Sequence, residues 1–377
     1  MSTYICFLFD HDMISEILFY TTAAILFIQT LYWGLSWVKI LNHYPTKEST
    51  PKPTSVIVCA HNEIDNLKEL IPLLLEQDHP EYEIIVVNDR SNDGTYDFLL
   101  NYNHPLVKPS RVDTVHDHIT AKKYAITLGV KAAQYERLLF IDADCRPDSS
   151  KWIQSMTNNF EEDTNFSIGV SLYNKGKGLL NYIIRLETLF TAINYTGFAL
   201  LGNPYMGVGR NLAYRKSNFL ENKGFNKYQR ITGGDDDLLV NQLAKSKTTI
   251  VALGKDALNH SIPKTSWGEW LRQKTRHISV SKHYRFLDKL LLGIQNLTHS
   301  LFWVSLVSLA LSTDQYILPA GLLLFRMFFM AFLCHSTSKR FGDRMNIGLV
   351  PILDVLYVFY VSIVGTKAIF TKNVRWK

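Results

Sequence analysis

The apolar residues of this chain are gathered into blocks at its two ends. One block, 14–38, precedes a long central region, and three more, 290–312, 316–334 and 349–370, follow it with short polar segments between them. Each has about the length of the roughly 20 apolar residues that cross the hydrocarbon core of a bilayer. Residues 54–283 instead have the regular turn residues of a water-soluble domain. The pattern predicts a protein that lies partly in a membrane and partly in water.

The first apolar block is predicted to be an uncleaved membrane helix. It is longer than the apolar run of about 7–15 residues in a signal peptide, and no basic residue precedes it. Lys39, Lys47 and Lys52 follow it. Because basic residues collect on the cytoplasmic side of a membrane, the central region is expected to be cytoplasmic.

The number of membrane crossings made by the three C-terminal blocks decides on which side the tail lies. Three crossings from a cytoplasmic domain would leave the basic tail, 371–377, on the outside. One block is therefore expected not to cross. We favour 290–312 for this role because Gln295, Asn296 and His299 interrupt it, as in a helix lying along the interface, although a crossing remains open.

Strand-like and helix-like patterns alternate in the central region. The expected strands are 55–59, 83–87, 112–115 and 137–141, and the expected helices are 64–76, 95–101 and 122–134. Such repeated units predict an α/β domain with a mostly parallel sheet and helices on both faces. Ligands of these sheets bind beyond the carboxyl ends of the strands, where Asp89 and the pair Asp142 and Asp144 lie.

Six motifs, in order, resemble family 2 glycosyltransferases. They are SVIVCAHNE at 55–63, NDRSNDGT at 88–95, IDADC at 141–145, GVGRNLAY at 207–214, GDDDLL at 234–239 and QKTRH at 273–277. The terminal apolar blocks suit the membrane-bound branch, which includes cellulose synthase and ceramide glucosyltransferase. The resemblance implies a Rossmann-like GT-A nucleotide-sugar-binding domain with flanking transmembrane or interfacial helices, and inversion at the anomeric carbon.

The resemblance and the apolar blocks together predict three parts. Residues 1–40 hold the N-terminal transmembrane helix, 41–285 form the cytoplasmic GT-A domain, and 286–377 form the C-terminal transmembrane or interfacial helices and basic tail. The protein is thus expected to be a multi-pass integral protein of the inner or plasma membrane.

The Asp-Ala-Asp triplet after the fourth strand is predicted to hold a divalent cation. A departing nucleoside diphosphate gains negative charge, which a cation held by carboxylates can neutralise. Asp144 is the expected ligand, and Asp142 is expected to contact the nucleotide or the metal. Hard oxygen ligands favour magnesium or manganese. An ordinary polar turn is the alternative, but the surrounding motifs favour the metal site.

Residues after the first two strands are predicted to contact the nucleoside. Asp89 suits a carboxylate that accepts hydrogen bonds from the base or ribose. Ala60 and Glu63 are expected to complete the wall, although Glu63 could equally be a first-turn helix acid. Asn88 stands where the resembling family commonly has an acid, which leaves the identity of the base open.

The acidic run 235–237 is predicted to supply the catalytic base. An inverting transfer needs a group that takes the proton of the acceptor hydroxyl. The resemblance aligns Asp235 and Asp236 with a Glu-Asp pair and makes Asp236 the base. In the alternative, the acids cap a helix over 238–245.

Gln273 and Arg276 are spaced to share one face of a helix. Arg276 is expected to make a charge-assisted contact with the diphosphate. Membrane members of the family commonly show Q-x-x-R-W, and His277 stands here in place of the tryptophan. This difference favours single addition of a sugar over polymer synthesis.

Two further segments each allow more than one interpretation. Residues 179–201 are predicted to form either an amphipathic helix at the membrane near the acceptor entrance or a buried core helix. Lys122 or Lys123 could meet phosphate, but a solvated helix face is the favoured interpretation.

Charge and cysteine content narrow the expected function. The net charge of +6 arises beside the apolar blocks, which indicates contact with anionic membrane lipids and not with nucleic acid. The 4 cysteines have no metal or disulfide spacing. The expected partners are a nucleotide-diphosphate sugar and a lipid-linked or glycan acceptor. A processive polysaccharide synthase and a catalytically silent scaffold that binds nucleotide sugar remain the alternatives.

Overall fold

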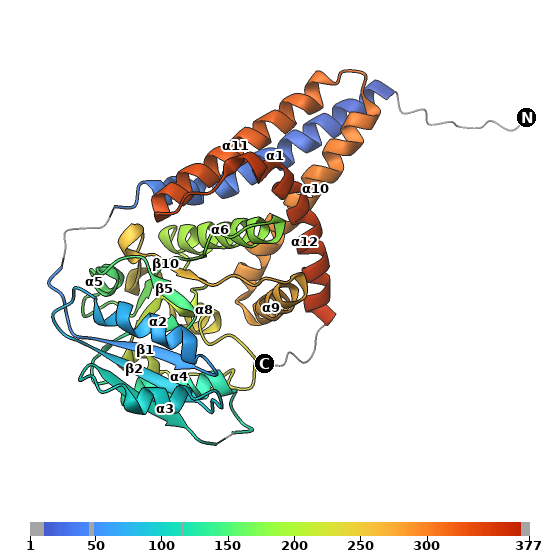
Figure 1. The fold of residues 1–377 in the computed structure, drawn as a ribbon. Helices are drawn as coiled ribbons and strands as arrows, with labels where there is room; N and C mark the ends of the chain where they lie inside the picture. The colour runs from blue at the N-terminus through green and yellow to red at the C-terminus, as the bar shows by residue number, and fades with distance from the viewer. Residues whose placement is uncertain (1–10, 45–48, 115, 371–377) are drawn as a thin grey trace, which may run out of the picture.

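A seven-stranded mixed sheet forms the centre of the computed structural model, which describes residues 11–44, 49–114 and 116–370 (Figure 1). The strand order is β3-β2-β1-β4-β8-β6-β9. The strands are β1 (Thr54–Ala60), β2 (Tyr82–Asp89), β3 (Val107–Val112), β4 (Arg137–Asp142), β6 (Phe166–Ile168), β8 (Leu212–Arg215) and β9 (Thr249–Val251). A smaller sheet has the order β5-β10-β7, from β5 (Cys145–Pro147), β7 (Ser171–Tyr173) and β10 (Asn259–Ser261).

The predicted α/β fold with a mostly parallel sheet is confirmed, and the position of one strand is corrected. Strands β3, β2, β1 and β4 are parallel, but β8 runs antiparallel to both of its neighbours, so the sheet is mixed. The third strand is 107–112 and not 112–115. It is an edge strand with mostly unburied residues between its two buried valines, so it lacks the apolar run expected of a central strand.

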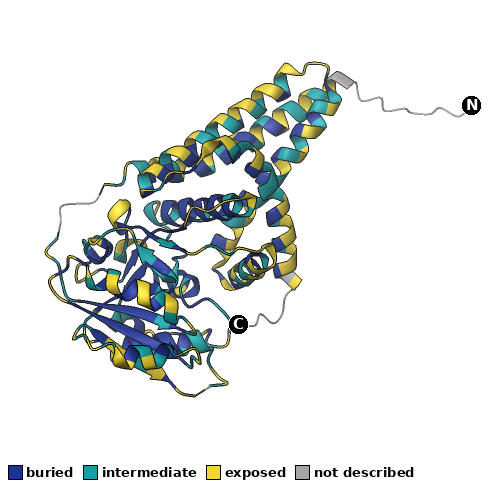
Figure 2. Ribbon diagram, in the orientation of Figure 1, coloured by how far each residue is buried: buried dark blue, intermediate teal, exposed yellow. Residues whose placement is uncertain are grey.

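Alternate residues of the central strands build two cores. Val56 and Val58 of β1 point to one face, where they meet α2 (Ile64–Leu75) and α5 (Trp152–Thr157), and Ile57 points to the other, where it meets α4 (Ala121–Ala132). The strands between these helices are buried on both faces (Figure 2). Shorter helices complete the domain: α3 (Thr95–Asn101), α7 (Lys216–Glu221) and α8 (Asp237–Leu243).

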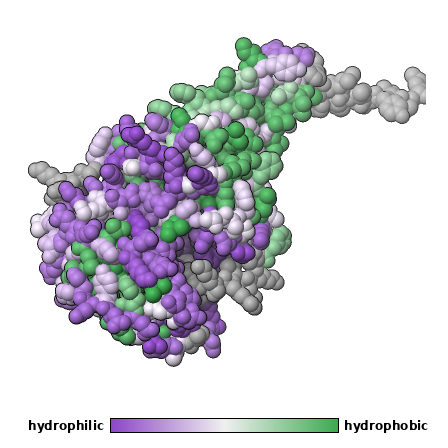
Figure 3. Space-filling model, in the orientation of Figure 1, coloured by the Kyte–Doolittle hydropathy of each residue, from purple (hydrophilic) through white to green (hydrophobic). Residues whose placement is uncertain are grey.

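Among the described residues, four helices are long and apolar enough to cross a membrane. They are α1 (His11–Leu41), α10 (Phe286–Ser312), α11 (Ile317–Phe341) and α12 (Val350–Phe370). Helices α1, α10 and α11 contact one another and project from the α/β domain, and hydrophobic surface gathers on this projection (Figure 3). Helix α12 turns away from the projection and runs beside α9 (Trp267–Val280).

The segment that gave two alternatives, 179–201, forms a buried helix. It is α6 (Leu179–Leu200), most of whose residues are buried, and it lies between the projecting helices and the α/β domain. A Cβ atom on Gly197 would lie 2.3 Å from Cβ of Ser36, so α6 and α1 cross at a contact that only glycine permits. Of the two alternatives, the buried core helix describes most of its length.

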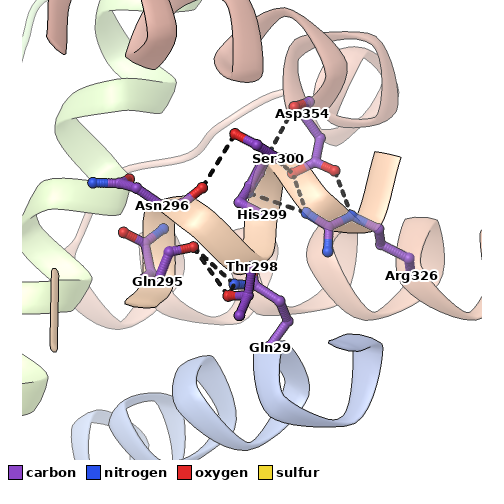
Figure 4. Close-up of polar contacts among 8 residues, drawn as sticks. All are labelled: Gln29, Gln295, Asn296, Thr298, His299, Ser300, Arg326 and Asp354. Carbon is purple, nitrogen blue, oxygen red and sulfur yellow. Dashed lines mark hydrogen bonds and ion pairs between the residues drawn. The ribbon is translucent and has the colours of Figure 1, made fainter. Parts of the chain in front are cut away.

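Buried polar side chains join the apolar helices to one another (Figure 4). Arg326 of α11 donates from Nε to Asp354 of α12 at 2.7 Å and from Nη2 to the same carboxylate at 3.1 Å. Nδ1 of His299 on α10 accepts from Arg326 at 3.2 Å, and its Nε2 donates to the Asp354 carbonyl at 3.0 Å. Gln29 of α1 donates to the backbone carbonyl of Gln295 at 2.9 Å.

Candidate active site

The carboxyl ends of three parallel strands meet at one edge of the sheet. Ala60 of β1 is level with Asn88 of β2, and Cys59 of β1 is level with Asp142 of β4. A cavity of about 1270 Å³ opens at this edge. Every residue expected from the sequence to bind or react lines it: Ala60, Glu63, Asp89, Asp142, Asp144, Asp235, Asp236, Gln273 and Arg276.

Lys122 connects two of the acidic motifs. Its Nζ lies 3.1 Å from Oδ1 of Asp142 and 3.2 Å from Oδ2 of Asp235. Burial alone would lower the pKa of this ammonium, but Asp142 and Asp235 outweigh burial and raise it well above its usual value. The expectation of a solvated helix face is therefore wrong. Lys123 is also buried, and its ammonium donates to the carbonyls of Ile231 and Gly233.

Asp142 and Asp144 can supply two of the oxygen ligands that a divalent cation needs. Burial raises the pKa of the Asp144 carboxyl, and the charge of Asp142 raises it further. A divalent cation would relieve this repulsion. No group of three or more His, Cys, Asp or Glu in the described part of the chain is arranged to hold a metal ion. Two carboxylates completed by substrate phosphates are nevertheless a usual way to bind magnesium.

The three acids before α8 have different surroundings. Asp235 faces Lys122, and Asp237 accepts from the hydroxyl of Tyr284 at 2.7 Å. Asp236 accepts from two backbone N–H groups, those of Gly209 at 2.6 Å and of Asp237 at 2.8 Å. It is also the least buried of the three. All three acids line the cavity, and Asp236 is both the N-cap of α8 and the most exposed of them.

Because their neighbours differ, the three acids have different pKa shifts. Burial acts to raise the pKa of Asp235, but Lys122 and Lys123 outweigh it, so the pKa is lowered. Burial and the charge of Asp235 raise the pKa of Asp236. Burial and Asp236 together raise the pKa of Asp237 well above its usual value. Asp235 is therefore held as an anion, and Asp236 has the greater affinity for a proton.

Glycine is needed where the chain approaches Asp236. A Cβ on Gly209 would lie 3.2 Å from both Cβ and Oδ2 of Asp236, which is tighter than ordinary contact. The preceding loop turns through Gly233 and Gly234, both with positive φ. Gly209 of the GVGRN motif therefore lets its backbone N–H approach and hold the Asp236 carboxylate.

Helix α9 brings Gln273 and Arg276 to the same cavity as the acids. Both residues line the cavity, as their spacing predicts. Nε2 of Gln273 donates to the hydroxyl of Tyr173 at 3.4 Å, whereas its Oε1 is buried and has no hydrogen-bond partner among the described residues. Burial lowers the pKa of Arg276 from that of a free guanidinium, and Asp235 and Asp142 act in the opposite direction.

The loops after β1 and β2 contribute the part of the cavity lining that the sequence predicts to contact a nucleoside. Asp89 is buried, and its Oδ1 accepts from Nε of Arg90 at 2.7 Å. Glu63 is the N-cap residue of α2, but its side chain does not cap the helix and instead accepts from Asn66 at 2.6 Å. Asn88 is buried and does not line the cavity, so its replacement of an acid does not change the lining.

Sequence reasoning missed several charged residues of the cavity. Arg210 donates to Ser171 at 2.7 Å and stacks on the ring of Tyr173 at 4.7 Å, beside the acidic pair. Glu187 of α6 and Lys274 of α9 form an ion pair in which both side chains are 9% exposed. These partners lie far apart along the chain, so no local pattern could have paired them.

Comparisons with known proteins find similarity to glycosyltransferases. The family model described as Glycosyl transferase family 2 matches residues 55–221. The Poly-beta-1,6-N-acetyl-D-glucosamine synthase of Staphylococcus epidermidis is 31% identical over 94 residues, which are 24% of this chain and 21% of the relative. The putative teichuronic acid biosynthesis glycosyltransferase TuaG of Bacillus subtilis is 29% identical over 120 residues, 31% of this chain and 46% of the relative. The chain thus covers less than half the length of these curated relatives.

A solved structure is similar over nearly the whole chain. The mannosyltransferase PcManGT from Pyrobaculum calidifontis, in complex with GDP-Man and Mn2+, has a TM-score of 0.57 and 16% sequence identity, and the likeness covers 95% of this chain and 100% of that one. This likeness supports the fold of the whole chain, and the family model supports the central part of its sequence. Residues 55–221 are therefore similar to family 2 glycosyltransferases, and the α/β domain has a GT-A-like fold that is joined, in the described part of the chain, to four long apolar helices.

Proposed function

We propose that this protein is an inverting glycosyltransferase that moves a sugar from a nucleotide-diphosphate donor to an acceptor hydroxyl at the cytoplasmic face of a membrane. The observation that carries the proposal is that Asp142, Asp144, Asp236 and Arg276 line one cavity at the end of the sheet. Such a crevice beyond the strand ends is the usual ligand site of an α/β sheet.

Two groups of residues bind the donor. Asp89, with Ala60 and Glu63 beside it, holds the nucleoside. Arg276 and Gln273 hold the diphosphate, since guanidinium groups form charge-assisted contacts with phosphate oxygens. The presence of GDP-Man in the similar mannosyltransferase structure supports a nucleotide sugar as donor.

Asp142 and Asp144 would hold a divalent cation, magnesium or manganese. Such an ion would neutralise the charge that develops on the departing diphosphate. The raised pKa of Asp144 supports this assignment, because a carboxylate pair that repels itself gains most from a cation. The Mn2+ in the mannosyltransferase complex is consistent with it. Lys122, already beside Asp142, adds a fixed positive charge.

Asp236 acts as the base. As the acceptor hydroxyl oxygen bonds to the anomeric carbon, the bond from that carbon to the diphosphate breaks. The hydroxyl proton passes to Asp236, and the nucleoside diphosphate leaves. Asp235 acts through its charge, which raises the proton affinity of Asp236.

The acceptor is a lipid-linked or glycan hydroxyl, with single addition favoured over polymer synthesis. His277 in place of the tryptophan of Q-x-x-R-W supports single addition. The likeness to a polysaccharide synthase supports the alternative, a processive enzyme. A catalytically silent scaffold is less well supported, because the expected metal acids and base all line one cavity.

A screen of the purified, detergent-solubilised protein against nucleotide sugars tests the proposal. Release of nucleoside diphosphate is measured with and without lipid acceptors, for the natural chain and for Asp144→Ala. We expect release with at least one donor and none with the variant. Donor binding without turnover under any condition would support the scaffold, and no binding of any nucleotide sugar would refute the donor class.

A further inference from the structure

The cavity extends beyond what a nucleotide sugar requires. Ligand pockets usually measure about 300–1,000 Å³, and this one measures about 1270 Å³. Its additional part, here named the deep arm, lies between helices α6, α10 and α12. The deep arm is lined by Thr191 and Asn194 of α6, Leu292 and Gln295 of α10, and Tyr357 and Val361 of α12.

Two buried amides of the deep arm lack hydrogen-bond partners. Oδ1 of Asn194 and Nε2 of Gln295 are paired with nothing in the described part of the chain, although these residues are only 6% and 2% exposed. Buried polar groups are costly unless they are hydrogen-bonded. One of these atoms accepts and the other donates. A hydroxyl can satisfy both kinds of group, because it donates one hydrogen bond and accepts others.

The charges near the deep arm cancel. Lys274 is ion-paired with Glu187, and Tyr360 and Thr191 each donate to that carboxylate at 3.3 Å. Lys367 also lines the cavity, but it lies ten residues beyond Tyr357, which is about 15 Å along a helix. An anionic phosphate would therefore lack an unneutralised cation in the deep arm itself, whereas a neutral head group would not need one.

The walls of the deep arm are fixed relative to the base. Asp288 at the start of α10 accepts from Asn241 of α8 at 2.9 Å and from Asn203 at 2.8 Å, so α10 is tied to the helix that Asp236 caps. The ion pair of Arg326 and Asp354 ties α12 to α11 (Figure 4). Helices α10 and α12, which wall the deep arm, have the length and apolar composition of membrane helices, so the deep arm borders the part of the protein that is expected to lie in lipid.

We propose that the deep arm binds a neutral, hydroxyl-bearing lipid of the diacylglycerol class as the sugar acceptor. Gln295 donates to an ester oxygen of the polar head, Asn194 accepts from the free hydroxyl when the lipid binds, and the acyl chains leave between α10 and α12. At transfer the hydroxyl turns from Asn194 to Asp236. Its oxygen bonds to the anomeric carbon, its proton passes to Asp236, the bond from that carbon to the diphosphate breaks, and the nucleoside diphosphate departs. The inference rests on the proposed function and names its acceptor.

A photoreactive diacylglycerol tests binding without requiring turnover. The full chain in phosphatidylcholine vesicles is crosslinked, digested and analysed by mass spectrometry. We expect crosslinks in α6, α10 or α12 that dioleoylglycerol removes by competition and that undecaprenyl phosphate or a soluble oligosaccharide does not. Absence of crosslinks from these helices, or competition by undecaprenyl phosphate alone, would overturn the proposal whatever the enzyme's activity.

Kinetics of paired variants give the second measurement. In Asn194→Leu and Gln295→Leu, the KM for dioleoylglycerol should rise about tenfold or more, while the dissociation constant of the nucleotide sugar stays unchanged. Gln154→Leu removes an amide outside the cavity and should leave both values unchanged. Transfer to undecaprenyl phosphate or to a soluble sugar, without transfer to dioleoylglycerol, would overturn the lipid assignment but leave the proposed glycosyltransferase intact. Failure to bind any nucleotide sugar would instead refute the proposed function.

Discussion

Backbone N–H groups hold the carboxylate of Asp236, and this sets it apart within its acidic run, although the charge of Lys122 also acts on it. Lys122 neutralises Asp235, and Tyr284 donates to Asp237. The two oxygens of Asp236 each receive one backbone N–H, which leaves further lone pairs for a substrate hydroxyl. A carboxylate held in this way can cap a helix and also take a proton, so the two interpretations of the acidic run are compatible.

Replacing Asp236 with asparagine separates these roles. Asparagine caps a helix about as well as aspartate but cannot take the proton. We expect turnover to fall by about 10²-fold or more, with little change in donor affinity measured by calorimetry. The matched variant Asp163→Asn, at an acid outside the cavity, should keep normal turnover. Near-normal activity of Asp236→Asn would move the base to Asp235 or Asp237.

The pH dependence of kcat/KM should report the same carboxylate. Burial and Asp235 raise the pKa of Asp236, so its basic form is lost at a higher pH than for an ordinary aspartate. The rate should therefore rise with pH through this raised pKa and then reach a plateau. Asp235→Asn removes a neighbouring negative charge and should move the rise to lower pH. A rise that stays in place, or moves to higher pH, contradicts the assignment.

Asp144→Ala should abolish turnover while the protein stays folded. The residue lies at the strand end and contributes little to either core, so circular dichroism and the unfolding temperature should change little. A strong chelator should likewise stop the natural enzyme, and added manganese or magnesium should restore it. Full turnover in the chelator would remove the cation from the proposal.

The residues found from sequence are those whose neighbours along the chain reveal them. Asp89 and Asp142 follow apolar strands, and Gln273 and Arg276 share a helix face, so local patterns place them. Lys122 could not be found in this way. The residue pattern of its helix does not mark Lys122 as special. Its importance comes from the ion pairs with Asp142 and Asp235, which only the folded chain brings together.

At the scale of elements, the ion pair of Arg326 and Asp354 joins two apolar helices. Both side chains are nearly unexposed, and His299 completes the cluster. Removing one partner of a buried pair leaves an uncompensated charge, which costs about 3–5 kcal/mol. Asp354→Leu should therefore lower the unfolding temperature in detergent markedly.

The double variant Arg326→Met with Asp354→Leu controls for the loss of the carboxylate itself. With neither charge left, stability should return to near that of the natural chain. If the double variant is as unstable as Asp354→Leu, the loss comes from packing and not from the unpaired arginine.

The helices and strands that the sequence predicted are those in which apolar residues recur with a clear period. The central strands and α2, α3 and α4 lie within a few residues of their expected ranges. Strand β3 was misplaced because an edge strand needs no apolar run. Helix α6 gave two interpretations because its polar residues, among them Glu187 and Asn194, face a cavity inside the molecule, which a sequence cannot distinguish from solvent.

At the scale of the whole molecule, the apolar helices do more than anchor the domain. Helix α12 packs on α9, which carries Gln273 and Arg276, and Tyr360 stacks on Trp270 with the ring centroids 5.0 Å apart. The wall of the cavity is thus partly made by a helix that looks like a membrane segment. The sequence predicted both helices, but their contact depends on a turn in the chain after α11 that no periodicity encodes.

The side of the membrane on which the domain lies stays a prediction, and cysteine labelling in intact cells tests it. Asn103, between α3 and β3, and Asp314, between α10 and α11, are both exposed. In a Cys6→Ser background the remaining cysteines are Cys59, which is partly buried, and Cys145 and Cys334, which are buried.

If the domain is cytoplasmic, an impermeant thiol reagent should label Asn103→Cys only after the cells are permeabilised.

Asp314→Cys tests which C-terminal helix fails to cross the membrane. The basic tail that raised this question, 371–377, lies outside the described residues. A crossing α10 would place position 314 outside, where the reagent labels it directly. An α10 along the interface would keep it protected until permeabilisation. Because α10 lies beside α1 in the projection, we expect direct labelling at 314, which would leave α12 as the helix that does not cross. Labelling of Asn103→Cys in intact cells would instead place the domain outside and refute the proposed orientation.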